Sequence, residues 1–201
     1  EIIASKGRAD IVTAFNVFAH ADDLKSIVKN VFKVLKNSGI FVIEVQYLLD
    51  TIKDLTFDNI YHEHVNYWSV HTLQFFFHSL DLQLVKVEHV NTHGGSIRAF
   101  ISAKKEAETD SSVEDFIARE KQFGLDNFAT LKQFASSVSD LKNTTNNKIK
   151  ELKSQGKFIV GYGSPAKATT VLNYYGINNE SIDYIIEDNE LKHNKFLPGM
   201  K

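Results

Sequence analysis

The densest run of chemically active side chains in the sequence is FDNIYHEH, residues 57–64. It places Tyr61, Glu63 and His64 close together, beyond the apolar run GIFVIEV, which predicts a buried strand. In α/β proteins ligands bind at the carboxyl edge of the sheet, which is where this loop would lie. A histidine beside a carboxylate or a phenol can remove a proton from a carbon acid. The run therefore predicts acid-base chemistry, with a solvated polar loop as the alternative interpretation.

A metal site is a competing interpretation of the same run, because His62 and His64 would point the same way on an extended strand. The zinc motif HExxH is absent, since Asn66 stands where its second histidine should be. The sequence also has no cysteine, which excludes a thiolate site and a disulfide. We therefore assign no metal ligand in this chain.

A second candidate site is the segment GYGSPAK, residues 161–167. Its glycines permit a tight turn after a strand, Ser164 can cap the next helix, and Pro165 suits the first helical position. A helix N-terminus attracts anions through its free N–H groups and its dipole, and Lys167 adds a full charge. The spacing is neither that of a P-loop nor GxGxxG. The segment predicts an anion site, and a plain strand-to-helix turn is the alternative.

Two shorter segments hold further polar residues. Asn16 and His20 follow the first predicted strand and so belong to the same sheet edge, although a lone histidine such as His20 is usually a surface residue. The run HGGSIR, residues 93–98, is typical of a hairpin turn.

The elements that must position these residues alternate between strand and helix. Strands are expected at residues 9–16, 39–45, 82–90, 96–103 and 182–187, with a strand, a glycine turn and a helix over 157–176. Helices are expected from Asp22 to a stop at Asn37 and Gly39, after a cap at Ser69, and from Ser112 to about Gln155 with a break at 124–127. Residues 46–68 are expected to form a loop.

This order of elements predicts an α/β fold in three segments. Residues 1–107 would form part of a parallel sheet that ends in a hairpin, because the first strand, helix and strand make one crossover unit. The polar stretch Glu106–Ser112 marks a boundary. Residues 108–156 would then form a helical connector, and residues 157–201 the start of a second, smaller parallel α/β domain.

Composition narrows the class of protein. The chain has 201 residues, of which 43% are hydrophobic and 24% charged, so it is neither a disulfide-stapled miniprotein nor disordered throughout. Its net charge of −2 provides no global attraction to nucleic acid or anionic lipid. No apolar run approaches the roughly 20 residues of a membrane helix, and residues 1–10 lack the basic-then-apolar order of a secretory signal. We expect a soluble, cytoplasmic protein without nucleic-acid or membrane partners.

Five motifs in order resemble one family over nearly the whole chain: NVFAHADDL, FDNIYHEHVNYWS, HGGSIR, GYGSPAKATTVLNYYGI and KFLPGM. The sequence is similar to S-adenosylmethionine-dependent sugar C-methyltransferases, which methylate C-3 of nucleotide-linked 4-keto deoxysugars. The resemblance implies a partial class I methyltransferase (Rossmann-like) sheet over residues 1–107. It also implies a nucleotide-sugar-binding domain that begins at residue 157.

The resemblance implies roles for individual residues. His64 would be the base that removes the C-3 proton, with Glu63 orienting it, Tyr61 binding the sugar or the enolate oxygen, and His20 facing the same pocket. Asn16 would lie beside the methyl donor. The substrate would contact Tyr162, Gly163, Ser164 and Lys167 through its diphosphate, and Ser96 and Arg98 elsewhere.

Family members also carry an N-terminal cysteine-rich zinc module and a glycine-rich loop for S-adenosylmethionine, and neither lies ahead of Glu1. The resemblance therefore predicts a fragment, with zinc only in the missing module and weak binding of S-adenosylmethionine by this chain alone. Ser164 stands where many relatives have alanine, and Ala168 where glycine is common, which affects the fine geometry of the loop. A non-catalytic nucleotide-sugar-binding module is the alternative function, and a histidine-ligated metal protein a third.

Overall fold

The computed structural model describes residues 2–104 and 107–200. Within them the chain forms two units: unit 1 runs to Thr56 and resumes over His62–Leu131, and unit 2 combines Phe57–Tyr61 with the chain from Lys132 onward. The division near residue 131 falls inside the segment expected to be a connector. Glu106, where the expected boundary begins, lies outside the described residues.

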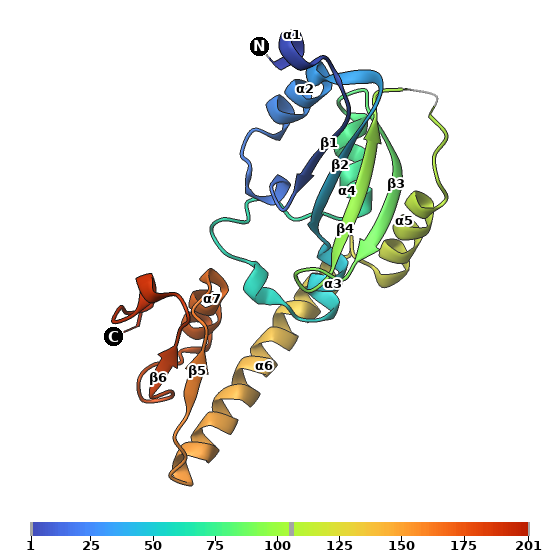
Figure 1. Cartoon of the computed structure of the whole chain (residues 1–201). Coiled ribbons are helices and arrows are strands. Elements are labelled where there is room, and N and C mark those ends of the chain that lie inside the picture. The colour runs from blue at the N-terminus through green and yellow to red at the C-terminus, as the bar shows by residue number, and fades with distance from the viewer. Residues whose placement is uncertain (1, 105–106, 201) are drawn as a thin grey trace. The chain divides into compact units, whose positions relative to one another are not determined.

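Unit 1 is built on a four-stranded mixed sheet with the order β1-β2-β4-β3 (Figure 1). Its strands are β1 (Ala9–Phe15), β2 (Leu35–Gln46), β3 (Gln83–Val90) and β4 (Ser96–Ser102). β1 and β2 are parallel, whereas β4 pairs antiparallel with both β2 and β3. The expected parallel crossover followed by a hairpin is therefore confirmed for the sheet of this unit.

The helices of unit 1 are α1 (Ile2–Lys6), η1 (Phe18–His20), α2 (Leu24–Val34), α3 (Leu48–Lys53), α4 (Val70–His78) and α5 (Ser112–Phe123). Two of them, α2 and α4, begin at a residue whose side chain accepts one of the first N–H groups. Asp23 caps α2 by accepting the N–H of Ser26 at 3.0 Å. Ser69 and Thr72 form a reciprocal capping box at α4, which confirms the helix expected after Ser69.

Two expectations about local structure are wrong. α2 stops at Val34 and β2 starts directly at Leu35 rather than at Gly39, because Leu35 is buried and pairs with Ala9 of β1. The segment expected to be loop over 46–68 contains α3, whose Thr51 and Ile52 are buried. In both cases tertiary burial outweighs the local signal.

The core of unit 1 is centred on an aromatic cluster. The ring of Phe18 is fully buried, and its centroid lies 6.0 Å from those of Phe41, Trp68 and Phe77. Aromatic pairs at this separation add to the stabilisation given by area burial alone. Phe18 stands two residues before His20, so the core fixes the segment that carries one of the candidate site residues.

Unit 2 contains a two-stranded parallel sheet. Its elements are η2 (Phe57–Asn59), most of α6 (Phe128–Ser154), β5 (Val160–Tyr162), α7 (Ala166–Tyr175), β6 (Tyr184–Ile186) and η3 (Glu190–Lys192). Gly161 lies opposite Ile185, and an added Cβ would come within 3.0 Å of the Ile185 side chain. The ring of Phe57 stacks on Tyr175 of α7 at 5.4 Å.

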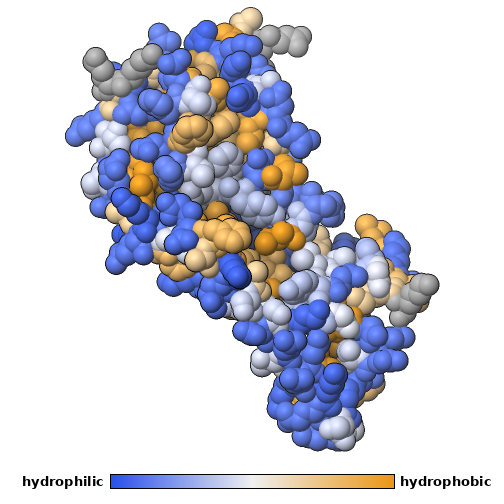
Figure 2. All heavy atoms as spheres, turned by 180° about the vertical axis from the view of Figure 1, so that it is seen from behind, coloured by the Kyte–Doolittle hydropathy of each residue, from blue (hydrophilic) through white to orange (hydrophobic). Residues whose placement is uncertain are grey.

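Figure 2 shows hydrophilic residues over most of one face, with hydrophobic residues between them. Phe75 of α4 is 75% exposed, in contrast to its buried neighbour Phe77. Among the described residues no helix combines the length and the apolar character needed to cross a membrane.

Candidate active site

The segment after β1 carries its polar residues to the carboxyl edge of the unit 1 sheet. Asn16 has a φ of 55°, a left-handed conformation that asparagine tolerates better than most residues. Its backbone N–H donates to the carbonyl of Glu44 in β2 at 3.0 Å. The buried ring of Phe18 then anchors η1, which ends at the exposed His20.

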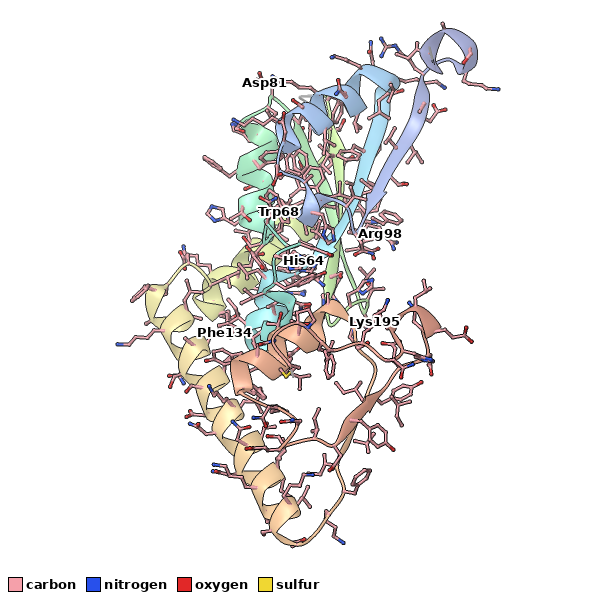
Figure 3. The ribbon with its side chains drawn as sticks, turned by 90° about the vertical axis from the view of Figure 1, so that its left-hand side faces the viewer. His64, Trp68, Asp81, Arg98, Phe134 and Lys195 are labelled. Atoms are coloured by element: carbon pink, nitrogen blue, oxygen red, sulfur yellow. The ribbon has the colours of Figure 1, made fainter. Side chains whose placement is uncertain are left out.

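His20 and His64 are neighbours in space. Their ring centroids lie 4.8 Å apart with an interplanar angle of 61°, and His64 is only 8% exposed. Figure 3 shows His64 close to the carboxyl end of the sheet. The structure thus brings together two imidazoles that the sequence places in separate motifs.

Backbone hydrogen bonds hold the two segments in place. The carbonyl of Ala19 accepts the N–H groups of Val65 at 2.9 Å and Asn66 at 3.2 Å. The side-chain amide of Asn66 donates to the carbonyl of Ala21 at 3.0 Å. These bonds fix the loop that carries His64 against the turn that carries His20.

The hydrogen bond of His20 defines its neutral tautomer. Nδ1 lies 2.9 Å from the carbonyl oxygen of Glu63. A carbonyl only accepts, so Nδ1 carries the proton and Nε2 has the free lone pair. His20 can therefore receive a proton on Nε2 without losing this contact.

Glu63 and Tyr61 are placed differently from the histidine pair. The Glu63 carboxylate lies 3.9 Å from Nε2 of His62, and both side chains are more than half exposed. Glu63 contacts the histidine pair through its backbone carbonyl, at His20. Tyr61 belongs to unit 2, together with η2.

The residues of the HGGSIR motif brace the β3–β4 turn. Nη2 of Arg98 pairs with Oε2 of the buried Glu44 at 2.8 Å, and the other oxygen of Glu44 accepts from the Thr92 hydroxyl at 3.1 Å. Ser96 is fully buried and its hydroxyl donates to the carbonyl of Thr92 at 3.0 Å. Arg98 ties this region to Glu44 of β2, and Ser96 closes the turn on Thr92; the substrate role that the resemblance implies for both stays a prediction.

The same turn carries His93. The turn motif alone indicates no chemical role for this residue. Nε2 of His93 lies 3.4 Å from the side-chain nitrogen of Asn16, and His93 has a φ of 52°. Non-glycine residues held in this region cluster at functional sites. In the sequence, the only sign of His93 is the HGG triplet of the turn. His93 comes close to Asn16 only because β4 pairs with β2.

In unit 2, Ser164 does not cap α7, so that prediction is wrong. Pro165 occupies the N-cap position, and the Ser164 hydroxyl donates to Oε2 of Glu187. The Ser164 N–H donates to the same oxygen at 2.8 Å. Glu187 follows β6 directly, and its carboxylate is an ionised acceptor. A hydrogen bond from the Ser164 hydroxyl to this carboxylate is stronger than a capping bond between the hydroxyl and a neutral backbone N–H.

The other residues assigned to the diphosphate also have partners within unit 2. The hydroxyl of Tyr162 donates to Oδ2 of Asp188 at 2.6 Å. Gly163, at a φ of 84°, donates its N–H to Ile186 at 2.7 Å. Nζ of Lys167 donates to the side-chain oxygen of Asn59, which is buried.

The contacts of Glu187 lower the pKa of its carboxyl group to about 2, chiefly through the Ser164 hydroxyl and then through the N–H groups of Asn189 and Ser164. Because the folded pKa lies below the ordinary value of 4.5, the ionised carboxylate stabilises the fold above that value. This contribution is lost as the pH falls toward 2. We expect the stability gap between wild type and Glu187→Gln to be widest above about pH 5 and to narrow toward pH 2.

Urea unfolding followed by far-ultraviolet circular dichroism measures this gap. Glu190→Gln is the matched control, since it removes a neighbouring exposed carboxylate from η3 and should give no pH-dependent gap. A gap for Glu187→Gln that stays constant from about pH 6 to pH 2.5 would contradict the assigned contacts.

Within the described ranges, no group of three or more histidine, aspartate or glutamate side chains is arranged to hold a metal ion. The arrangement in unit 1 is instead one of paired imidazoles at a sheet edge. Such a site can accept and pass on a proton.

Family comparisons match the chain in two consecutive parts. Residues 1–87 match a family described as a methyltransferase domain, and residues 91–201 match one described as the C-methyltransferase C-terminal domain. The chain therefore belongs to the C-methyltransferase family, and its mixed sheet is consistent with a methyltransferase fold. The resemblance found in the sequence motifs is confirmed at this level.

Among curated proteins the chain is similar to C-methyltransferase NovU from Streptomyces niveus. The two are 31% identical over 202 residues, which cover all of this chain and 48% of the relative. The chain thus spans about half the length of the curated relative it matches.

Proposed function

We propose that this chain supplies the acid-base residues and nucleotide contacts of an S-adenosylmethionine-dependent C-methyltransferase. Its substrate is a nucleotide-linked 4-keto deoxysugar, and the methyl group goes to C-3. The observation that best supports this function is the pair of His20 and His64 at the sheet edge, in a chain that belongs to the C-methyltransferase family. A hydrogen on the carbon beside a ketone is acidic enough for an imidazole to remove.

His64 is the proposed base. When the neutral ring takes the C-3 proton, the electrons of the C–H bond move toward the ketone oxygen and leave an enolate. The ring of His64 is largely buried, and the ring of His20 lies next to it. Nε2 of His20, which the bond of Nδ1 to Glu63 leaves unprotonated, is the proposed acceptor that takes the proton onward.

Tyr61 and Glu63 keep the supporting roles that the family resemblance implies. A phenol hydroxyl can donate to the enolate oxygen, which carries the developing charge. The exposed carboxylate of Glu63 can balance the imidazolium electrostatically, while its carbonyl fixes His20.

Asn16 is the proposed contact to the cofactor. Its side chain is exposed at the carboxyl edge of β1, offers both donors and an acceptor, and lies beside His93, which fits the polar amino-acid part of S-adenosylmethionine. S-adenosylmethionine, when bound, supplies an electrophilic methyl group for the carbon that has lost its proton. Asn16 and His93 would bind the amino-acid part of S-adenosylmethionine and in this way orient its methyl group.

The proposal is tested with the complete enzyme and a nucleotide-linked 4-keto deoxysugar. S-adenosylmethionine with an isotopically labelled methyl group is the donor, and nuclear magnetic resonance locates the label in the product. We expect the label on C-3 of the sugar. Transfer to oxygen, or no transfer to any sugar nucleotide of this class, would refute the proposed function.

Lys167→Ala should weaken the binding of a nucleoside diphosphate about ten- to a hundredfold, since a charge-assisted contact to phosphate contributes about 1.5 to 3 kcal/mol. Isothermal titration calorimetry of the 201-residue chain measures this. Lys157→Ala is the control, because Lys157 precedes β5 and lies away from its carboxyl end. Equal affinities for wild type and Lys167→Ala, with the fold intact by circular dichroism, would mean that the loop is a plain strand-to-helix turn and not an anion site.

A further inference from the structure

The glycine-rich loop of unit 2 already holds an anion, and that anion belongs to the protein. Oε2 of Glu187 accepts from both the N–H and the hydroxyl of Ser164. These are donors that the family resemblance assigns to the diphosphate of the substrate. The carboxylate therefore occupies donors that a phosphate oxygen would use under the proposed function.

Glu187 is held firmly in this position. Its other oxygen, Oε1, accepts the N–H of Asn189 at 3.0 Å, and Nζ of Lys192 lies 3.5 Å from Oε2. The backbone carbonyl of Glu187 contacts Nε2 of His193 at 2.6 Å. The side chain is only 16% exposed, so the carboxylate is part of the loop rather than a mobile surface group.

Charge decides what this arrangement does to a phosphate. Two negative groups in contact repel each other, and more strongly near a protein surface than in bulk water. A diphosphate cannot take the Ser164 donors without either displacing Glu187 or lying against it. The residue that fixes the loop thus opposes the ligand that the loop would bind.

We propose that Glu187 is an internal competitor for the phosphate of the nucleotide and sets the affinity of unit 2 for it. The inference rests on the proposed function, because it takes the ligand to be a nucleoside diphosphate sugar. Lys167 attracts the diphosphate, whereas Glu187 lowers the affinity of unit 2 for it. The lower affinity favours release of the product nucleotide. When the nucleotide binds, the N–H and hydroxyl of Ser164 must exchange the Glu187 carboxylate for a phosphate oxygen as their acceptor.

Glu187→Gln tests this directly, since glutamine keeps an oxygen for Ser164 but has no charge. The 201-residue chain is titrated calorimetrically with uridine 5′-diphosphate and with thymidine 5′-diphosphate. We expect the variant to bind whichever nucleotide the wild type binds about tenfold more tightly, with the gain shrinking at high salt. Glu190→Gln, which removes a nearby carboxylate of η3 with no assigned contact to Ser164, should change the affinity much less.

The sign of the change separates competition from a purely structural role. If Glu187 only braces the loop, its replacement weakens binding or leaves it unchanged, and either result overturns the inference while the proposed function stands. If wild type and both variants bind neither nucleotide at millimolar concentrations, the nucleotide role of unit 2 fails and the inference fails with it.

Discussion

Replacing His64 by asparagine in the complete enzyme should slow methyl transfer by about 10² to 10⁴, the usual contribution of a general base. Nucleotide-sugar binding should stay near normal, because the proposed diphosphate contacts involve other residues. Asparagine preserves a polar side chain of moderate size but cannot accept a proton at neutral pH. The substitution should therefore lower the rate constant of methyl transfer and leave the dissociation constant of the nucleotide sugar unchanged.

The matched control is His78→Asn, since His78 is an exposed histidine at the end of α4 with no assigned role. It should leave the rate unchanged. A second readout is exchange of the C-3 hydrogen with deuterated water in the presence of a non-reactive cofactor analogue. Wild type should incorporate deuterium and His64→Asn should not. If His64→Asn kept both exchange and methylation, the proton would leave through His20, Glu63 or Tyr61, and His64 would not be the base.

Phe18→Ala should destabilise unit 1 by about 3 to 5 kcal/mol, the usual cost of removing a buried phenyl ring. The ring is fully buried and packs on Phe41, Trp68 and Phe77, so its loss leaves a cavity that these rigid rings cannot close. Urea unfolding followed by tryptophan fluorescence measures the effect. Trp68 is the one tryptophan in the sequence and is itself a neighbour of Phe18.

Phe75→Ala provides the comparison, because Phe75 has the same side chain but is 75% exposed on α4. Its removal should change the free energy of unfolding by no more than about 0.5 kcal/mol. A Phe18→Ala variant within about 1 kcal/mol of wild type would mean that Phe18 is not part of the core.

Much of the fold of unit 1 could be predicted because its signals are local. Asp23 and Ser69 are capping residues at the beginning of helices, and the run GIFVIEV is apolar on both faces, as a covered strand must be. The sequence could not show that Leu35 leaves the helix, because the reason is its pairing with Ala9. α3 is not predictable in the same way, because Tyr47, at its N-cap, makes no side-chain capping bond.

The candidate site was predictable by residue type more than by contact. The spacing of Asn16 and His20 after an apolar run indicated a sheet edge, and the structure puts His20 beside His64. Ser164 has the residue type of a cap, but its partner, Glu187, follows another strand. Contacts between distant segments leave no spacing pattern in a single sequence, and for the same reason the sequence alone indicates no role for His93.

Unit 2 is discontinuous along the chain, since it includes residues 57–61 as well as the chain from Lys132 onward. Phe57 stacks on Tyr175, and Asn59 accepts from Lys167. A chimaera that exchanged only residues 132–201 between two relatives would pair one parent's Phe57 and Asn59 with the other parent's helix. A viable transplant must carry the short segment as well, and Tyr61 is part of it. If unit 2 binds the nucleotide as proposed, grafting a new nucleotide preference into this scaffold would also transfer a piece of the donor's proposed catalytic loop.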